Sequence, residues 1–190
     1  MSGNFSEFGT WETFTSFVNR AGWAWKNLLG QDKELVLRGG QIVFPATSKL
    51  SANVNTLDDY EEGTWTPKLT FNGGTTGITY TTQVGYYRKI GSLVLLWYWI
   101  VLSSKGSSTG TAFIEDLPFN AASNGGMTSP VLFFNMTSSF TSMVHSQDVS
   151  PLRFVFYGLT AAAVSYAVVT DADFADTSNV RTAFSYFTSE

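Results

Sequence analysis

Residues 93–102 read LVLLWYWIVL, the longest apolar run in the chain. A β-strand with one wet face alternates apolar and polar side chains, but here both alternating sets are apolar. One set can fill the core of a sandwich. The other set needs a cover of its own, because exposed tryptophans on a sheet invite aggregation. This second set consists of Leu93, Leu95, Trp97, Trp99 and Val101.

Two kinds of cover are open for the second set. The favoured one is contact between copies of the chain, which makes these five side chains an oligomer interface. The other is a second layer of the same subunit, which would bury the strand on both faces. If copies of the chain cover this face, the protein is an oligomer. If a second layer of the same subunit covers it, the protein can be a monomer.

The composition indicates a folded domain rich in short strands. The chain has 190 residues, of which 44% are apolar and 14% are charged, a balance that disordered proteins do not have. Aromatic residues make up 16%, and 17 glycines accompany them, which favours strands joined by tight turns. The net charge of −4, without a basic cluster, argues against a nucleic-acid partner.

The absence of cysteine excludes several kinds of structural and catalytic site. With none in the chain, disulfide scaffolds, thiol nucleophiles and cysteine zinc sites are excluded. The longest apolar run is too short to span a bilayer as a helix, so we expect no membrane insertion. A protein that works outside a cell without disulfides must gain durability elsewhere, for example by burial between subunits.

Periodicity and turn residues predict a mainly β domain over residues 67–190. Turn signals such as Asn72-Gly73-Gly74, Gly91 and Lys105–Gly110 separate the apolar stretches. The number and spacing of these stretches predict a jelly-roll-like antiparallel β-sandwich. The expected strands are Thr66–Phe71, Ile78–Thr82, Gln83–Lys89, Leu93–Leu102, Thr111–Glu115, Val131–Met136, Phe140–Val144, Leu152–Tyr157, Val164–Val169 and Val180–Phe187.

The first 66 residues predict a helix followed by a neck. Over residues 11–29, apolar side chains recur at spacings of three and four, which predicts an amphipathic α-helix within an N-terminal segment of residues 1–39. The charges of this helix nearly balance, so contact with protein is favoured over a membrane surface. Residues 40–66 predict a short neck, with Pro45 ending regular pairing and a polar stretch after it.

Two acidic clusters are candidates for metal binding or acid–base chemistry. Asp58, Asp59, Glu61 and Glu62 lack the spacing of a dedicated calcium loop, so we expect solvated neck residues there. A cation site or a polar loop could form at the second cluster, and the loop is the expected reading. This cluster comprises Asp171, Asp173 and Asp176.

The single histidine, His145, is the remaining candidate for catalysis. Ser142, Ser146 and Asp148 are close to it in sequence, but no nucleophile-elbow pattern surrounds them. An ordinary histidine at the end of a strand is therefore expected. The sequence predicts no catalytic residue, no cofactor and no enzymatic activity.

Several motifs, in this order, resemble the C-terminal β-sandwich module of bacteriophage and prophage tail fibre or short fibre proteins. The resemblance covers residues 40–190. Any single motif is weak evidence, and the specificity comes from the occurrence of all the motifs in the same order. The motifs are GQIVFPAT at 40–47, NTLDDYEEGTWTP at 55–67, TGITY at 76–80, GYYRKIG at 85–91, LPF at 117–119, DFADTS at 173–178 and FSYF at 184–187.

The resemblance implies a homotrimer at the tip of a virion fibre, assembled in the bacterial cytoplasm and preceded by a neck. Such tips commonly recognise host-surface glycans or proteins. The implied trimer agrees with the interface expected at Leu93–Val101. Segment 1–39 would attach the fibre to other virion proteins, and its anchor candidates are Trp11, Phe14, Phe17, Trp23 and Trp25.

Two other functions stay open at this point. The first is an architectural role without a receptor, as a head fibre, a decoration protein or a tail connector. The second is a spike that degrades host polysaccharide, which would need a long groove with paired acids. The polar loops 103–109 and 120–129 are candidates for host contact, but no receptor-binding residue can be assigned from the sequence.

Overall fold

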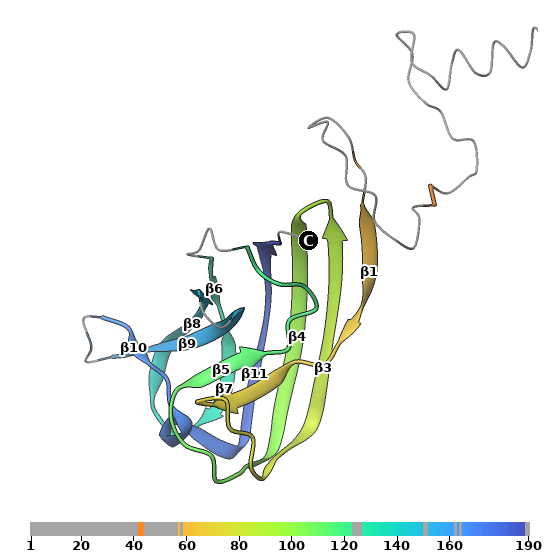
Figure 1. Ribbon diagram of the computed structural model, residues 1–190. Helices are drawn as coiled ribbons and strands as arrows, with labels where there is room; N and C mark the ends of the chain where they lie inside the picture. Colours follow the sequence, from red (N-terminus) through yellow and green to blue (C-terminus); the bar gives the residue numbers. More distant parts are fainter. Residues whose placement is uncertain are drawn as a thin grey trace, which may run out of the picture. The chain divides into compact units, whose positions relative to one another are not determined.

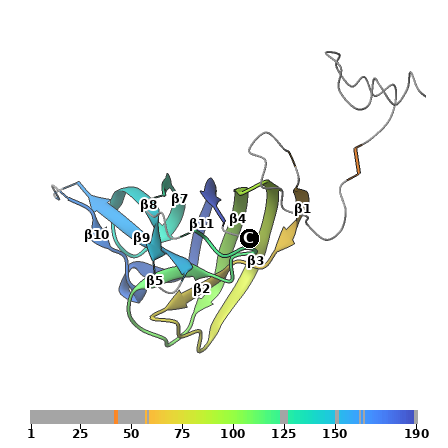
Figure 2. The ribbon, with the colours of Figure 1, turned by 45° about the horizontal axis from the view of Figure 1, so that its top comes forward.

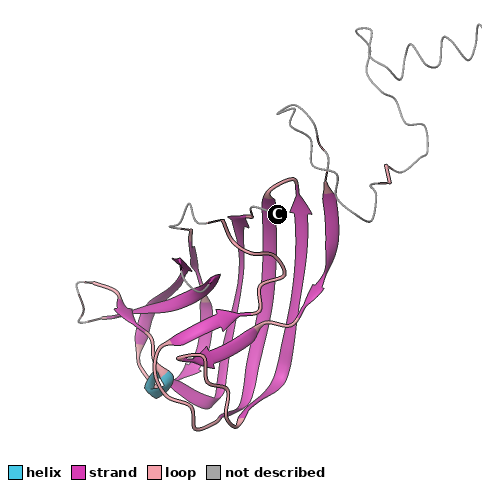
Figure 3. Ribbon diagram, viewed as in Figure 1, coloured by secondary structure: helices cyan, strands magenta, loops and turns pink. Residues whose placement is uncertain are grey.

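A computed structural model describes residues 42–43, 57, 59–122, 127–149, 152–161, 163 and 165–188. The described sheets belong to one compact unit, Phe44–Glu190. This unit is mainly β, and its strands form two antiparallel sheets packed as a sandwich (Figure 1, Figure 3). The predicted mainly β, antiparallel fold is therefore confirmed.

The first sheet has five strands in the order β1-β3-β4-β11-β7. Its central strand, β4, lies between the two long strands β3 and β11 (Figure 2). The five strands are β1 Tyr60–Trp65, β3 Ile78–Ile90, β4 Leu93–Lys105, β7 Leu132–Met136 and β11 Phe174–Phe187.

The second sheet has six strands, with five in the order β2-β5-β9-β8-β6 and β10 paired to β9. A short 3-10 helix, Asp171–Asp173, leads from this sheet into β11. The six strands are β2 Lys68–Phe71, β5 Ala112–Glu115, β6 Thr128–Pro130, β8 Phe140–Val149, β9 Leu152–Thr160 and β10 Ala167–Val168.

The core lies between the sheets, and one face of β4 fills its middle. The side chains of this face are at most 2% exposed, as predicted for one of the two apolar sets of this strand. They pack against inward side chains of the second sheet such as Leu69, Ile114, Phe154 and Phe156. The buried set of β4 comprises Val94, Leu96, Tyr98, Ile100 and Leu102.

Pairs of an aromatic residue and a glycine fix the register between β1 and β3. Trp65 is opposite Gly85, and its Nε1 donates to the carbonyl of Trp97 on the next strand at 3.3 Å. A Cβ on Gly85 would collide with the Trp65 indole, and a Cβ on Gly63 would collide with the ring of Tyr87 opposite it. The GTWTP and GYYRKIG motifs thus pack against each other across two strands.

Several elements differ from the strands expected from the sequence. The two stretches Ile78–Thr82 and Gln83–Lys89 form one continuous strand, β3, with irregular pairing at Thr79–Thr82. Strand β1 lies within residues 40–66, for which the sequence predicts a neck. Its two adjacent glutamates interrupt the apolar–polar alternation by which a strand is recognised. Of the described residues of the expected strand Val164–Val169, only Ala167–Val168 form a strand, β10.

Asp59 corrects the expectation of a solvated neck carboxylate. It is only 6% exposed and forms an ion pair with the ammonium group of Lys89, a residue that is 3% exposed. The ammonium group also lies 5.2 Å from the centre of the Phe119 ring, and the Asp59 carbonyl accepts from the N–H of Gly91 at 2.9 Å. This residue therefore ties the start of β1 to the end of β3.

His145 lies within β8 and inside the core, which corrects its expected place at a strand end. Its ring is fully buried between Phe154 and Phe184, with ring centres 4.7 and 4.3 Å away. Neither ring nitrogen has a hydrogen-bond partner among the described residues, and the same is true of the neighbouring Tyr98 hydroxyl. Burial lowers the pKa of His145 to about 3, so its ring is neutral in the folded protein.

This buried ring predicts a loss of stability in acid. Because the pKa of His145 is about 3 when folded and near 6.5 when unfolded, the unfolded chain binds the extra proton as the pH falls between these values. We expect the wild-type protein to lose about 2 kcal/mol more than a His145→Phe variant between pH 7 and pH 5. Urea unfolding at one fixed protein concentration measures this difference. Equal losses in both proteins would contradict the prediction.

The predicted N-terminal helix at 11–29, its anchor residues and most of the predicted neck lie outside the described residues. Ile42 and Val43 are described, and both are exposed. Asp58 lies outside as well. In the part of the chain that the structure describes, no helix has the length and apolar character needed to cross a membrane.

Candidate interaction surface

The candidate site is the outer face of the five-stranded sheet, meaning the side that points away from the core. Because neighbouring residues of a strand point to opposite sides, the residues that alternate with the buried set of β4 belong to this outer face. Eight large apolar side chains on the outer face are each at least 36% exposed. They are Tyr60, Val84, Tyr86, Ile90, Leu95, Leu132, Phe134 and Phe187.

The five residues predicted as the interface all lie on the outer face, in its central strand. Leu95 is 43% exposed, while Leu93, Trp97, Trp99 and Val101 are half-buried by side chains of the adjacent strands. No second layer of described residues covers them. Their location is therefore compatible with an intersubunit contact, which stays a prediction.

Side chains from neighbouring strands extend this apolar set in rows across the sheet. One row joins Thr64, Tyr86, Trp97 and Ala183, which are aligned in register on β1, β3, β4 and β11. The Tyr86 and Trp97 rings are 5.5 Å apart with an interplanar angle of 32°. Such contacts hold the aromatic side chains in place before any partner binds.

The outer face is hollowed on the side of β1 and β3. A groove of about 580 Å³ has Tyr86, Leu95 and Trp97 on its apolar wall and Glu62 and Arg88 at its rim. Glu62 accepts from Arg88 Nε at 3.3 Å and from the Tyr60 hydroxyl at 2.8 Å. The polar rim is thus organised within the subunit, and the apolar wall is left open.

The two flanks of the outer face differ in charge. On β1 and β3, the outer side has the Glu62 carboxylate paired with Arg88, whereas Glu61 is opposite the buried Lys89 and points to the other side of the sheet. The Tyr87 hydroxyl donates to the Glu61 carboxylate, which raises the pKa of Tyr87 to about 12. On β11, the Arg181 guanidinium lies 5.7 Å from the rings of Trp99 and Phe134 and forms no ion pair with a described carboxylate.

The outer side of the six-stranded sheet has a different character. Arg153 pairs there with Asp148 at 3.0 Å and with Glu115 at 3.5 Å, and its guanidinium covers the Phe113 ring at 3.5 Å. Among the described strand residues of this sheet, Val168 is the large apolar side chain that is exposed. The apolar surface of the sandwich is therefore concentrated on one of its two sides.

Sequence reasoning found the centre of the outer face but missed its flanks. Tyr86 and Val84 belong to an alternating stretch, and Leu132 and Phe134 to a short apolar one. Assigning them to the same face as Trp97 requires the strand register, which the sequence does not supply. The sequence signal that could have placed Val84 and Tyr86 on one face is the alternation of side chains in residues 84–90, since every second residue of a strand points to the same side.

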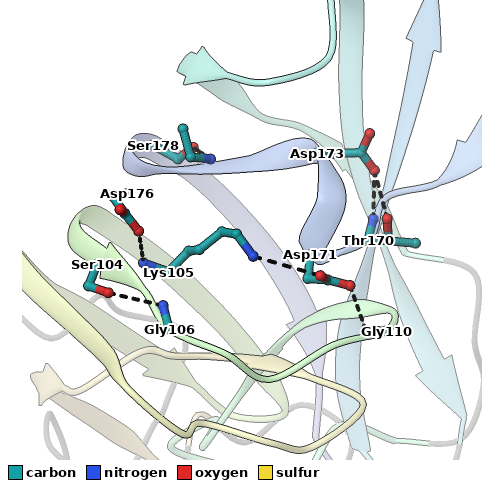
Figure 4. Close-up of polar contacts among 10 residues, drawn as sticks. Ser104, Lys105, Gly106, Gly110, Thr170, Asp171, Asp173, Asp176 and Ser178 are labelled. Atoms are coloured by element: carbon teal, nitrogen blue, oxygen red, sulfur yellow. Dashed lines mark hydrogen bonds and ion pairs between the residues drawn. The ribbon is translucent and has the colours of Figure 1, made fainter.

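The second acidic cluster binds parts of its own chain (Figure 4). Asp171 accepts from the Gly110 N–H at 2.7 Å and lies 3.7 Å from Lys105 Nζ, and Asp176 accepts from the Lys105 N–H at 2.8 Å. Asp173 accepts from the Thr170 N–H at 2.8 Å. Asp171 and Asp176 thus hold the β4–β5 turn against the start of β11. The cluster differs from the expected polar loop, because Asp171 and Asp173 belong to the 3-10 helix and Asp176 belongs to β11.

The residues near His145 do not converge on it. His145 points into the core, whereas Ser142, Ser146 and Asp148 alternate to the other side of β8. Asp148 pairs with Arg153, and the Ser142 hydroxyl lies 3.0 Å from the Tyr166 hydroxyl. The structure thus separates the groups that a hydrolytic triad would bring together.

Within the described ranges, no group of three or more histidine, aspartate or glutamate residues is placed to hold a metal ion. The chain matches no model of a protein family, and no curated protein matches it. The outer face, with its exposed apolar side chains, is therefore the candidate functional site.

Proposed function

We propose that this chain is a bacteriophage virion protein, a short homotrimeric fibre whose N-terminal segment docks to the particle and whose sandwich faces the host surface. The observation that carries the proposal is the outer face, which has eight of the large exposed apolar side chains of the described strands, whereas the six-stranded sheet has Val168. A contiguous apolar surface of this kind marks an interaction site. The resemblance of residues 40–190 to phage fibre modules supports the fibre and the number of subunits.

The proposal includes the jelly-roll-like arrangement, the neck and the N-terminal attachment helix. Three copies of one sandwich would place three equal binding sites on one rigid knob. Linked sites turn weak individual binding into strong overall attachment, because each later contact forms at a high effective concentration. A weak host-surface glycan or protein site is then sufficient for adhesion.

Size-exclusion chromatography with light scattering tests the oligomer. The purified chain is expected to elute with the mass of three copies of the 20.8 kDa subunit. A monomer at low micromolar concentration would count against the proposal. Crosslinking of the same sample at several concentrations separates a stable trimer from concentration-driven association.

Binding to host cells separates a receptor-binding fibre from an architectural protein. A fluorescently labelled trimer is expected to bind the host surface in a way that host glycans or a surface protein extract compete. An architectural protein would not bind cells, and the virion would show its sandwich covered by other particle proteins. Release of oligosaccharide from host capsule would instead indicate a degrading spike.

A further inference from the structure

We infer that the outer face is divided into two complementary flanks and that, in the trimer, one flank of each subunit packs against the opposite flank of the next. This inference rests on the proposed trimer and specifies how it is built. The occupant of the outer face is then a second copy of this chain. Strand β4 would lie closest to the threefold axis, and its Leu95 and Trp97 would meet their own symmetry copies.

The strand order leads to this arrangement. In the order β1-β3-β4-β11-β7, two strands lie on each side of β4. When three equal sheets turn the same face towards a common axis, rotation brings the β1–β3 flank of one copy to the β11–β7 flank of its neighbour. Such a contact joins two different patches and closes into a ring, as cyclic oligomers require.

The two flanks match in shape. The groove of about 580 Å³ has most of its lining on β1, β3 and β4 and reaches Ala183 on β11. The β11–β7 flank instead presents Leu132 and Phe134, which are 50% and 45% exposed. One flank offers an apolar hollow and the other offers apolar side chains that can enter it.

The distribution of charge also favours contact between opposite flanks. On the outer side of the β1–β3 flank the Glu62 carboxylate pairs with Arg88, whereas Glu61 is opposite the buried Lys89 and points to the other side of the sheet. Arg181 gives the β11–β7 flank a guanidinium without an ion pair among the described carboxylates. A contact between opposite flanks therefore brings Arg181 to the flank that has the Glu62 carboxylate, whereas a contact between two β11–β7 flanks would bring two Arg181 guanidinium groups together.

Engineered cysteines test this packing, because the natural chain has none. Thr64 and Ala183 are exposed ends of one row of the outer face. They are separated by three strand spacings, about 14 Å, so a disulfide cannot join them within one chain. The double variant Thr64→Cys/Ala183→Cys is expected to give a three-chain band after mild oxidation on a non-reducing gel, and reduction should remove it.

Four controls make the result interpretable. Neither single cysteine variant should give the three-chain band, and pairing Thr64→Cys with Thr109→Cys, in an exposed turn, should not give it either. The double serine variant at positions 64 and 183 should remain trimeric, which shows that the positions tolerate substitution. A second pair in the next row, Glu62→Cys/Ser185→Cys, is expected to behave like the first.

Two outcomes would overturn the inference. Two-chain products from either single variant would show like flanks in contact, as in a face-to-face dimer. A trimer by light scattering that neither cysteine pair locks would show that the subunits meet through another surface, and the proposed function would survive that result. A monomeric wild-type protein would instead remove the proposed function itself, so the two failures are distinguishable.

Discussion

Leu95→Glu is expected to convert the trimer into folded monomers. Leu95 is near the start of β4, the central strand of the outer face, where the three subunits would meet. Truncating or charging a residue at the centre of an interface costs about 2 kcal/mol or more for each copy. Three copies give about 6 kcal/mol, which weakens the trimer association constant by a factor on the order of 10⁴. Because three chains associate, the concentration needed for assembly rises by the square root of this factor, on the order of 10².

The subunit itself should tolerate this change. Leu95 is 43% exposed and lies opposite Arg88 across the β3–β4 pair, so a glutamate there has solvent and a cation beside it. Surface substitutions of this kind usually change the free energy of unfolding by about 0.5 kcal/mol or less. The variant is therefore expected to keep the circular dichroism of a β protein while light scattering gives the mass of one chain.

Val168→Glu is the matched control for Leu95→Glu. Val168 is also 43% exposed and also lies in a strand, but in the six-stranded sheet with the ion-paired outer side. The control is expected to remain trimeric. A Leu95→Glu protein that stays trimeric at micromolar concentration would show that the outer face is not the subunit contact. Dissociation of both variants would point to a contact that involves both sheets.

The sequence was informative where the relevant signal was local. The double apolar alternation of residues 93–102 predicted both a buried face and a face in need of cover, and the structure has the first at Tyr98 and the second at Leu95. The turns at Asn72–Gly74 and Gly91 were also predicted. They contain left-handed backbone at Asn72 and Gly91, with φ of 50° and 55°. Turn chemistry of this kind is readable because it depends on adjacent residues.

The sequence was uninformative where the partner is distant. The sequence predicts a solvated carboxylate at Asp59, because no basic residue is near it in the chain. The structure pairs this carboxylate with Lys89, which is 30 residues away in the sequence. Strand β6 is too short and polar for a periodic signal. The flanks of the outer face depend on the register of β3, β11 and β7 against β4, and a shift by one residue would have placed Tyr86 in the core.

Lys89→Met is expected to lower the free energy of unfolding by about 3–5 kcal/mol, because it leaves the Asp59 carboxylate buried without its cation. Both groups are nearly inaccessible to water, so solvent cannot replace the lost partner. Methionine fills much of the volume of the lysine stem, which keeps the change mainly electrostatic. The loss is measured by urea unfolding at pH 7 and at one protein concentration.

The adjacent residue, Arg88, supplies a control with the same charge and a similarly long side chain. Arg88 pairs with Glu62 at 3.3 Å, but both side chains are more than half exposed, and such surface pairs contribute about 1 kcal/mol or less. Arg88→Met should therefore cost far less than Lys89→Met. A double variant, Lys89→Met/Asp59→Leu, should recover part of the stability, since it removes the stranded carboxylate. If both single variants unfold alike, Asp59 is solvated and the buried ion pair does not hold β1 to β3.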